Sequence, residues 1–181
     1  MARTSLILGG ARSGKSAFAE RLAGTDRRVA YVATATARDD EVHERIRRQR
    51  LRRSKTWTTY EQPLDVAEIV HALSEQYEAI LVDSVLLYVT NMLLADELDR
   101  VSDAGILSAI DQLVRACRVS KADVLIVSGE VGCGVAPTDD LTRRFRDVMG
   151  RANQKLAAGA DEVYLVVTGI GQRIKPPRDE P

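Results

Sequence analysis

A glycine-rich segment near the start of the chain constrains the fold more than any other feature. The segment GGARSGKS at residues 9–16 follows the apolar run LIL and precedes a stretch with helical spacing. It matches the pattern G-x-x-x-x-G-K-[ST], with Gly9, Gly14, Lys15 and Ser16 in the fixed positions. Such a loop requires a strand before it and a helix after it. The sequence therefore predicts a strand, a tight loop and a helix in that order.

The residue types of this loop favour phosphate binding over a turn without a ligand. Glycines let the backbone curl until its N–H groups point inward, and the N-terminus of the following helix adds positive potential. Lys15 is expected to reach the outer phosphates, and the Ser16 hydroxyl is expected to bind Mg²⁺. We expect the phosphates of a nucleotide to contact Gly9, Gly10, Ala11, Arg12, Ser13, Gly14, Lys15 and Ser16.

Short aliphatic runs alternate with longer segments of helical period. Buried strands are predicted at residues 5–8, 29–34, 79–84, 123–129 and 162–169. Helices are predicted through Phe18 and Leu22 to Gly24, after Pro63, after the N-cap candidate Ser102, and over Thr138 to Ala158. The alternation predicts an α/β fold, with a mostly parallel sheet covered by helices on both faces.

Length and composition indicate one ordinary globular domain. The chain has 181 residues, and 26 Lys and Arg balance 26 Asp and Glu. We predict a single nucleotide-binding catalytic domain over residues 1–175 and a loose tail over residues 176–181. The sequence shows no secretory signal or membrane span, so the expected location is the cytoplasm. Cys117 and Cys133 lack metal-site spacing and are interpreted as structural or incidental thiols.

An acidic residue at the end of another apolar run extends the hypothesis to a metal. The run AILVD ends in Asp83. Phosphate loops of this kind work with a carboxylate at the end of a neighbouring strand, which reaches the metal directly or through water. The alternative is a helix N-cap or turn carboxylate. Paired with the loop, Asp83 is interpreted as a ligand of Mg²⁺ together with Ser16.

Residues 45–55 carry seven basic side chains in eleven positions. Three interpretations are a solvated helix face, a site for the phosphates of a small ligand, and a nucleic-acid surface. No aromatic residue is interleaved before Trp57 and the whole chain is neutral, so we predict phosphate binding and no nucleic-acid partner. His43 and His71 are the two histidines; each is a weak functional clue.

Seven segments spread over nearly the whole chain resemble one family, the bifunctional adenosylcobinamide kinases/adenosylcobinamide-phosphate guanylyltransferases of cobalamin biosynthesis. The matching segments are GGARSGKS at 9–16, YVATATARDDE at 31–41, RIRRQRLRRSKTW at 45–57, EQP at 61–63, VDSVLLYVTNML at 82–93, EVGCGVAP at 130–137 and FRDVMGRANQKLAAGADEVYLVVTGI at 145–170. The resemblance implies a P-loop NTPase domain of RecA-like architecture, assembled as a homotrimer. It also implies two reactions on a corrinoid: phosphorylation of adenosylcobinamide by ATP or GTP, then transfer of GMP from GTP to give adenosylcobinamide-GDP.

The resemblance also implies where a GTP or ATP substrate is contacted outside the loop. Carried over position by position, the implied nucleotide contacts are Thr34, Ala35, Thr36, Arg50, Leu51, Arg52, Arg53, Glu61 and Asp83. Glu61 or the basic stretch is expected to contact the base or the ribose. Lys15 is the expected catalytic residue of phosphoryl transfer.

Gln49 departs from the family pattern at the residue on which the second reaction depends. The resemblance implies that GMP is carried on a histidine, and aligning the basic stretch through Trp57 places Gln49 at that position. A carboxamide nitrogen is a poor nucleophile because its lone pair is delocalised, whereas neutral imidazole is a good one. His43 lies six residues earlier, about 120° around a helix, and is not a simple substitute. Three explanations stay open: an engineered substitution, a natural kinase-only or diverged relative, or a shifted register.

Two smaller departures and two competing functions complete the interpretation. Gly129 stands where the family usually has Asn, and Ser84 stands where Cys is frequent.

A generic small-molecule P-loop kinase would explain Lys15, Ser16 and Asp83 equally well, but it leaves the segments after residue 129 unexplained. A nucleotide-binding regulator or assembly ATPase is the alternative from a different class, and salt-dependent nucleic-acid binding would favour it.

Overall fold

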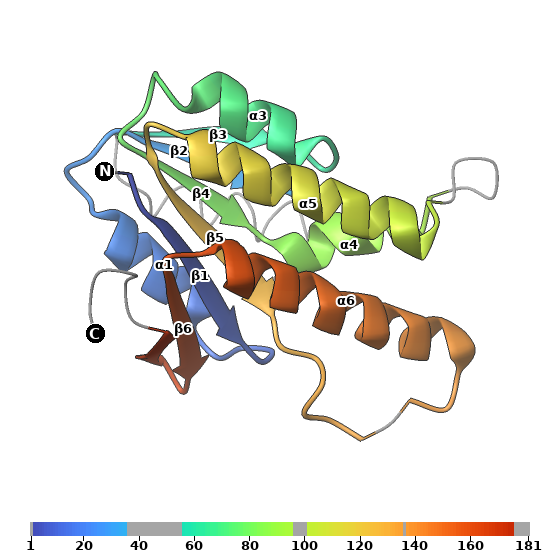
Figure 1. Ribbon diagram of the computed structural model, residues 1–181. Coiled ribbons are helices and arrows are strands. Elements are labelled where there is room, and N and C mark those ends of the chain that lie inside the picture. The colour runs from blue at the N-terminus through green and yellow to red at the C-terminus, as the bar shows by residue number, and fades with distance from the viewer. Residues whose placement is uncertain (1, 36–55, 96–100, 136, 176–181) are drawn as a thin grey trace.

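Seven strands form one sheet at the centre of the molecule (Figure 1). The computed structural model describes residues 2–35, 56–95, 101–135 and 137–175. The strand order is β3-β2-β4-β5-β1-β6-β7; β1 to β6 run parallel, and β7 pairs antiparallel with β6. The strands are β1 (Thr4–Gly9), β2 (Val29–Ala33), β3 (Trp57–Glu61), β4 (Ala79–Asp83), β5 (Asp123–Gly129), β6 (Glu162–Val167) and β7 (Ile170–Lys175).

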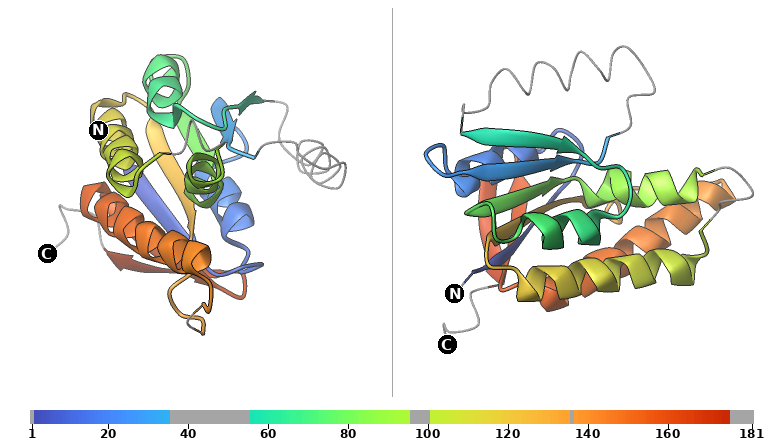
Figure 2. Two further views of the ribbon diagram at one scale, coloured as in Figure 1. Left: turned by 90° about the vertical axis from the view of Figure 1, so that its right-hand side faces the viewer. Right: turned by 90° about the horizontal axis from the view of Figure 1, so that it is seen from above.

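Helices cover both faces of this sheet, as the three views show (Figures 1 and 2). The described helices are α1 (Lys15–Ala23), α3 (Val66–Leu73), α4 (Val85–Leu93), α5 (Asp103–Val119) and α6 (Asp140–Gly159). A smaller apolar core lies between the sheet and α1, and a larger one lies between the sheet and α3 to α6. The predicted mostly parallel α/β architecture is confirmed. No described helix combines the length and the apolar character that crossing a membrane requires.

The structure adds three elements that the sequence patterns did not predict: β3, β7 and α4. The first two are half-buried or exposed strands at the two ends of the sheet, so they lack an apolar run. The helix expected over Thr138 to Ala158 begins two residues later, at Asp140. The cause is Asp139, whose side chain accepts a hydrogen bond from Thr142 N at 2.8 Å and so caps the helix.

The strand that ends in Asp83 is not adjacent to the strand that leads into the glycine-rich loop, contrary to our expectation. β5 is inserted between β4 and β1 and pairs with both in parallel. Val127 is the register partner of Asp83 on one side and of Ile7 on the other. Asp83 therefore lies level with Ile7, two residues before Gly9, and two strand spacings, roughly 9–10 Å, to its side.

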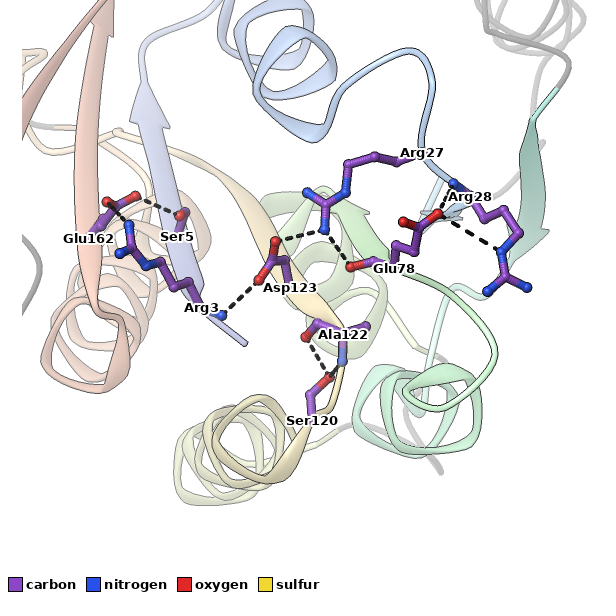
Figure 3. Close-up of polar contacts among 9 residues, drawn as sticks. All are labelled: Arg3, Ser5, Arg27, Arg28, Glu78, Ser120, Ala122, Asp123 and Glu162. Atoms are coloured by element: carbon purple, nitrogen blue, oxygen red, sulfur yellow. Dashed lines mark hydrogen bonds and ion pairs between the residues drawn. The ribbon is translucent and has the colours of Figure 1, made fainter. Parts of the chain in front are cut away.

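Charged side chains tie together the edge of the sheet at which the parallel strands begin, here called the amino edge (Figure 3). Asp123 accepts hydrogen bonds from Arg3 N at 2.9 Å and from the Arg27 guanidinium at 2.7 Å. Arg27 also donates to the carbonyl oxygen of Glu78 at 2.7 Å. Arg3 lies 3.6 Å from the carboxylate of Glu162 at the start of β6. These contacts join the segments at which β1, β2, β4, β5 and β6 begin.

The two cysteines have different surroundings. Cys117 lies in the last turn of α5 inside the larger core, and burial raises the pKa of its thiol to about 12. Cys133 is exposed in the loop that follows β5. A thiol reacts as its thiolate, so both the raised pKa and the burial suppress the reactivity of Cys117.

We predict that one thiol of the folded protein reacts rapidly with a disulfide reagent such as DTNB at about pH 8, and that both react after unfolding in urea. Cys133→Ser should remove the rapid reaction. The absorbance of the thiolate that DTNB releases would measure the rate. Equal rates for both thiols in the folded protein would contradict the buried position of Cys117.

Candidate nucleotide site at the carboxyl edge of the sheet

The glycine-rich loop connects the end of β1 to the start of α1. Ser13 N donates to Gly10 O at 3.3 Å, and Phe18 N donates to Gly14 O at 2.9 Å. Gly14 is the N-cap of α1, has a φ of 88°, and provides no side-chain cap. The first N–H groups of α1 therefore have no side-chain acceptor from the N-cap residue, an arrangement that suits an anion. The strand–loop–helix unit predicted from the sequence is confirmed.

Close packing explains why two loop positions require glycine. A side chain at Gly9 would collide with the hydroxyl of Ser13 and would lie 2.7 Å from Val166 O. Gly14 has a positive φ, and a Cβ there would lie 3.0 Å from the Cα of Gly169. Gly169 N in turn donates to Ser13 O at 2.7 Å. The turn between β6 and β7 thus supports the loop, a contact that sequence reasoning missed.

The reactive side chains of the loop lie at its helical end. Lys15 Nζ donates to Gly10 O at 3.1 Å, so the lysine folds back over the loop. Ser16 is half-buried in the first turn of α1. Among the described residues, Ser13 Oγ is a buried side-chain oxygen without a hydrogen-bond partner. The loop therefore contains a lysine and two hydroxyls beside the N-terminus of α1, which suits the phosphates of a nucleotide.

Asp83 ends β4 at the same edge of the sheet, here called the carboxyl edge. Its carboxylate is half-buried, and Oδ2 accepts a hydrogen bond from the hydroxyl of Tyr31 at 2.7 Å. The described residues contain no group of three or more His, Cys, Asp or Glu side chains that could enclose a metal. A site with one carboxylate and one serine hydroxyl fits Mg²⁺, which prefers oxygen ligands and usually completes its shell with water and substrate phosphates.

Thr34 braces the ends of β2 and β4. It is fully buried; its Oγ1 donates to Ser84 O at 2.7 Å and accepts from Ser84 N at 2.8 Å, across a strand end where the Asp83–Ser84 peptide is cis. On α4, the Asn91 amide donates to Thr34 O at 2.8 Å and to Pro63 O at 3.0 Å. The structure gives Thr34 a bracing role, and its direct contact with a nucleotide stays a prediction.

A second brace fixes the end of β5 beside the loop. Glu130 N donates to Gly9 O at 3.0 Å, which continues the strand pairing to the first residue of the loop. From α6, the buried Asn153 donates to Gly129 O at 3.0 Å and accepts from the Ser128 hydroxyl at 2.7 Å. At Gly129 a Cβ would overlap the side chain of Leu86, so leucine fills the space beside this glycine. Sequence reasoning missed these braces, although the segments EVG and RANQ point to them.

The remaining predicted contacts are divided between described and undescribed residues. Glu61 is exposed at the end of β3, where it pairs in register with Ala33, and so it lies at the carboxyl edge. Ala35 is half-buried directly after Thr34. The predictions for Thr36, Gln49, Arg50, Leu51, Arg52 and Arg53 lie outside the described residues. The structure thus brings together at one edge the loop, Asp83, Thr34 and Glu61.

Solved structures with a similar fold include a recombinase and a bacteriophage protein. The RadB recombinase superposes with a TM-score of 0.53 at 12% identity, covering 90% of this chain and 73% of the recombinase. The P4 protein of bacteriophage phi6, solved in complex with ADP, gives a TM-score of 0.51 at 15% identity, covering 98% of this chain and 56% of P4. These likenesses confirm the predicted RecA-like, P-loop fold class.

The known proteins with similar sequences are named as bifunctional adenosylcobalamin biosynthesis proteins. The bifunctional adenosylcobalamin biosynthesis protein CobU of Escherichia coli (strain K12) is 43% identical over 178 residues, and CobU of Salmonella typhimurium (strain LT2) is 42% identical over 178 residues. Both alignments cover 94% of this chain and 98% of the relative. The corresponding CobP of Pseudomonas aeruginosa is 38% identical over 171 residues, covering 94% of this chain and 96% of CobP.

A family model gives the same assignment over a longer stretch than the phosphate loop. The model described as cobinamide kinase / cobinamide phosphate guanyltransferase matches residues 5–174, from the first strand to the last. The match therefore includes the loop, Asp83 and both braces of the carboxyl edge. The chain belongs to the cobinamide kinase / cobinamide phosphate guanyltransferase family.

Proposed function

We propose that this chain is an adenosylcobinamide kinase that uses ATP or GTP. The observation that carries the proposal is the placement of the phosphate loop and Asp83 at one edge of the sheet, in a chain that matches the family from residue 5 to residue 174. A generic P-loop kinase would share the loop but not the family segments that build the braces from Asn91 and Asn153. The corrinoid is therefore the favoured phosphoryl acceptor.

In the proposed reaction, the hydroxyl oxygen of the corrinoid side arm forms a bond to the γ-phosphorus of the nucleotide. The bond from that phosphorus to the β–γ bridging oxygen breaks, the nucleoside diphosphate leaves, and the proton of the hydroxyl is released to water. Lys15 and the N–H groups of the loop and of α1 stabilise the charge on the phosphoryl oxygens. Ser16 and Asp83 would hold Mg²⁺, which neutralises phosphate charge when bound. The protein thus contributes mainly positioning and electrostatics.

For guanylyl transfer, we propose that this chain does not form the covalent GMP intermediate. The second reaction of the family transfers GMP from GTP to the corrinoid phosphate. The resemblance assigns this step to a histidine, and the corresponding position in this sequence is Gln49. Gln49 accepts and donates hydrogen bonds, but its amide nitrogen does not attack phosphorus at a useful rate. The residues proposed for the kinase step, Lys15, Ser16 and Asp83, are other positions of the sequence, and all three are present.

Three further features of the proposal come from the family. We propose that the protein acts as a homotrimer, that its cofactor is Mg²⁺, and that it works in the cytoplasm on adenosylcobinamide. The oxygen ligands at Ser16 and Asp83 support Mg²⁺. The balanced charge of the chain, with 26 basic and 26 acidic residues, supports a small-molecule substrate over a nucleic acid.

Lys15→Ala is predicted to lower the kcat of corrinoid phosphorylation by at least about 100-fold, because it removes a charge that stabilises the transferred phosphoryl group. Mass spectrometry of the corrinoid products over time would measure the rate. Lys121→Ala is the matched control, since Lys121 forms an exposed ion pair with Glu75 at the amino edge. An unchanged rate in Lys15→Ala would exclude the proposed role of the lysine.

Gln49→His is predicted to restore the second reaction. With adenosylcobinamide, Mg²⁺ and GTP, the parent protein should stop at the corrinoid phosphate, while the variant should continue to adenosylcobinamide-GDP and retain label from α-labelled GTP on the protein. Gln154→His, at an exposed position of α6, serves as the control for an added histidine.

Two other results would change the assignment. If the parent protein itself makes adenosylcobinamide-GDP, the proposed loss of guanylyl transfer is wrong. If neither protein modifies the corrinoid, the acceptor is wrong and a kinase for another small molecule takes its place.

A further inference from the structure

Tyr31 makes a contact with the candidate metal ligand that the proposed reaction has not used. Its hydroxyl donates to Asp83 Oδ2 at 2.7 Å, while the residue itself is 3% exposed. The ring belongs to the smaller core beneath α1 and packs against Trp57 with ring centroids 6.4 Å apart. A phenylalanine would fill this apolar space, so the hydroxyl adds a polar interaction directed at one carboxylate.

The strand register explains how Tyr31 reaches Asp83. On β2 and β4, Tyr31 pairs with Leu81 and Ala33 pairs with Asp83. Side chains two residues apart on a strand share a face, so Tyr31 and Asp83 are diagonal neighbours on the face that α1 covers. Ala33, the direct register partner of Asp83, has no polar group. The hydrogen bond to the carboxylate therefore comes from the long aromatic side chain one step away.

We propose that Tyr31 is a positioning residue for magnesium binding, which acts by holding the carboxylate of Asp83 in one orientation. A carboxylate with one oxygen fixed by a buried donor cannot rotate freely, so its other oxygen keeps one direction. Partners behind a metal ligand commonly change metal affinity because they orient that ligand. The inference rests on the proposed role of Asp83, and the experiment below separates the two.

The neighbouring strand provides a matched comparison. Tyr60 on β3 also has a hydroxyl in a 2.7 Å hydrogen bond, but its partner is the hydroxyl of Tyr77. The two rings meet edge to face with centroids 6.1 Å apart, and they pack against the larger core on the other face of the sheet. Removing the hydroxyl of Tyr60 therefore perturbs a similar bond without touching a carboxylate.

The test compares Tyr31→Phe, Tyr60→Phe and Asp83→Asn with the parent protein. Mn²⁺ replaces Mg²⁺ as the probe, and electron paramagnetic resonance of free Mn²⁺ measures the Kd of the metal in the presence of a non-hydrolysable GTP analogue. Tyr31→Phe should raise the Kd of Mn²⁺ about tenfold. Binding of the analogue in EDTA should stay within twofold of the parent, which shows that the folded site persists. Tyr60→Phe should leave both values within twofold.

The double variant Tyr31→Phe/Asp83→Asn tests whether the tyrosine acts through the carboxylate. Its Kd for Mn²⁺ should equal that of Asp83→Asn alone. A further loss in the double variant, or a Tyr31→Phe value within twofold of the parent while Asp83→Asn binds Mn²⁺ weakly, would overturn the role of Tyr31 only. Parent-like binding of Mn²⁺ by Asp83→Asn would instead overturn the proposed metal role of Asp83, and the role of Tyr31 with it.

Discussion

The insertion of β5 between β1 and β4 sets the geometry on which the candidate site depends. β5 pairs in parallel with both strands, so the loop after Gly9 and the carboxylate of Asp83 are held two strand spacings apart by backbone hydrogen bonds. These two strand spacings place Asp83 roughly 9–10 Å to the side of the strand that leads into the loop. If the two strands were adjacent, the carboxylate would lie directly beside the loop.

Local sequence patterns predicted the phosphate loop and the buried strands, because each depends on residues that are close together in the sequence. The loop is defined by glycines that a crowded turn requires, and the aliphatic strands β1, β2, β4 and β5 are defined by burial on both faces. β3 and β7 were missed because strands at the ends of a sheet alternate polar and apolar residues weakly. α4 was missed because a run as apolar as VLLYVTNML shows little helical periodicity.

The supporting contacts of the site could not be predicted in the same way, because their partners are far apart in the sequence. Asn91 joins Thr34 O to Pro63 O, and Asn153 joins α6 to the end of β5. Neither asparagine has a spacing that distinguishes it from a surface residue. The family resemblance indicated that these segments matter, but the contacts that explain why appear only in the folded chain. The same holds for Tyr31, which reads in the sequence as an ordinary strand residue.

The two edges of the sheet are held by different kinds of interaction. At the amino edge, charged groups such as Arg27 and Asp123 meet at partly exposed positions. At the carboxyl edge, the braces from Thr34, Asn91 and Asn153 join neutral groups. Dissolved salt screens the first kind and hardly affects the second. A rise in ionic strength would therefore weaken the contacts at the amino edge, while the spacing between the phosphate loop and the carboxylate of Asp83 persists. The effect of salt on nucleotide affinity would then report the charged groups that contact the phosphates.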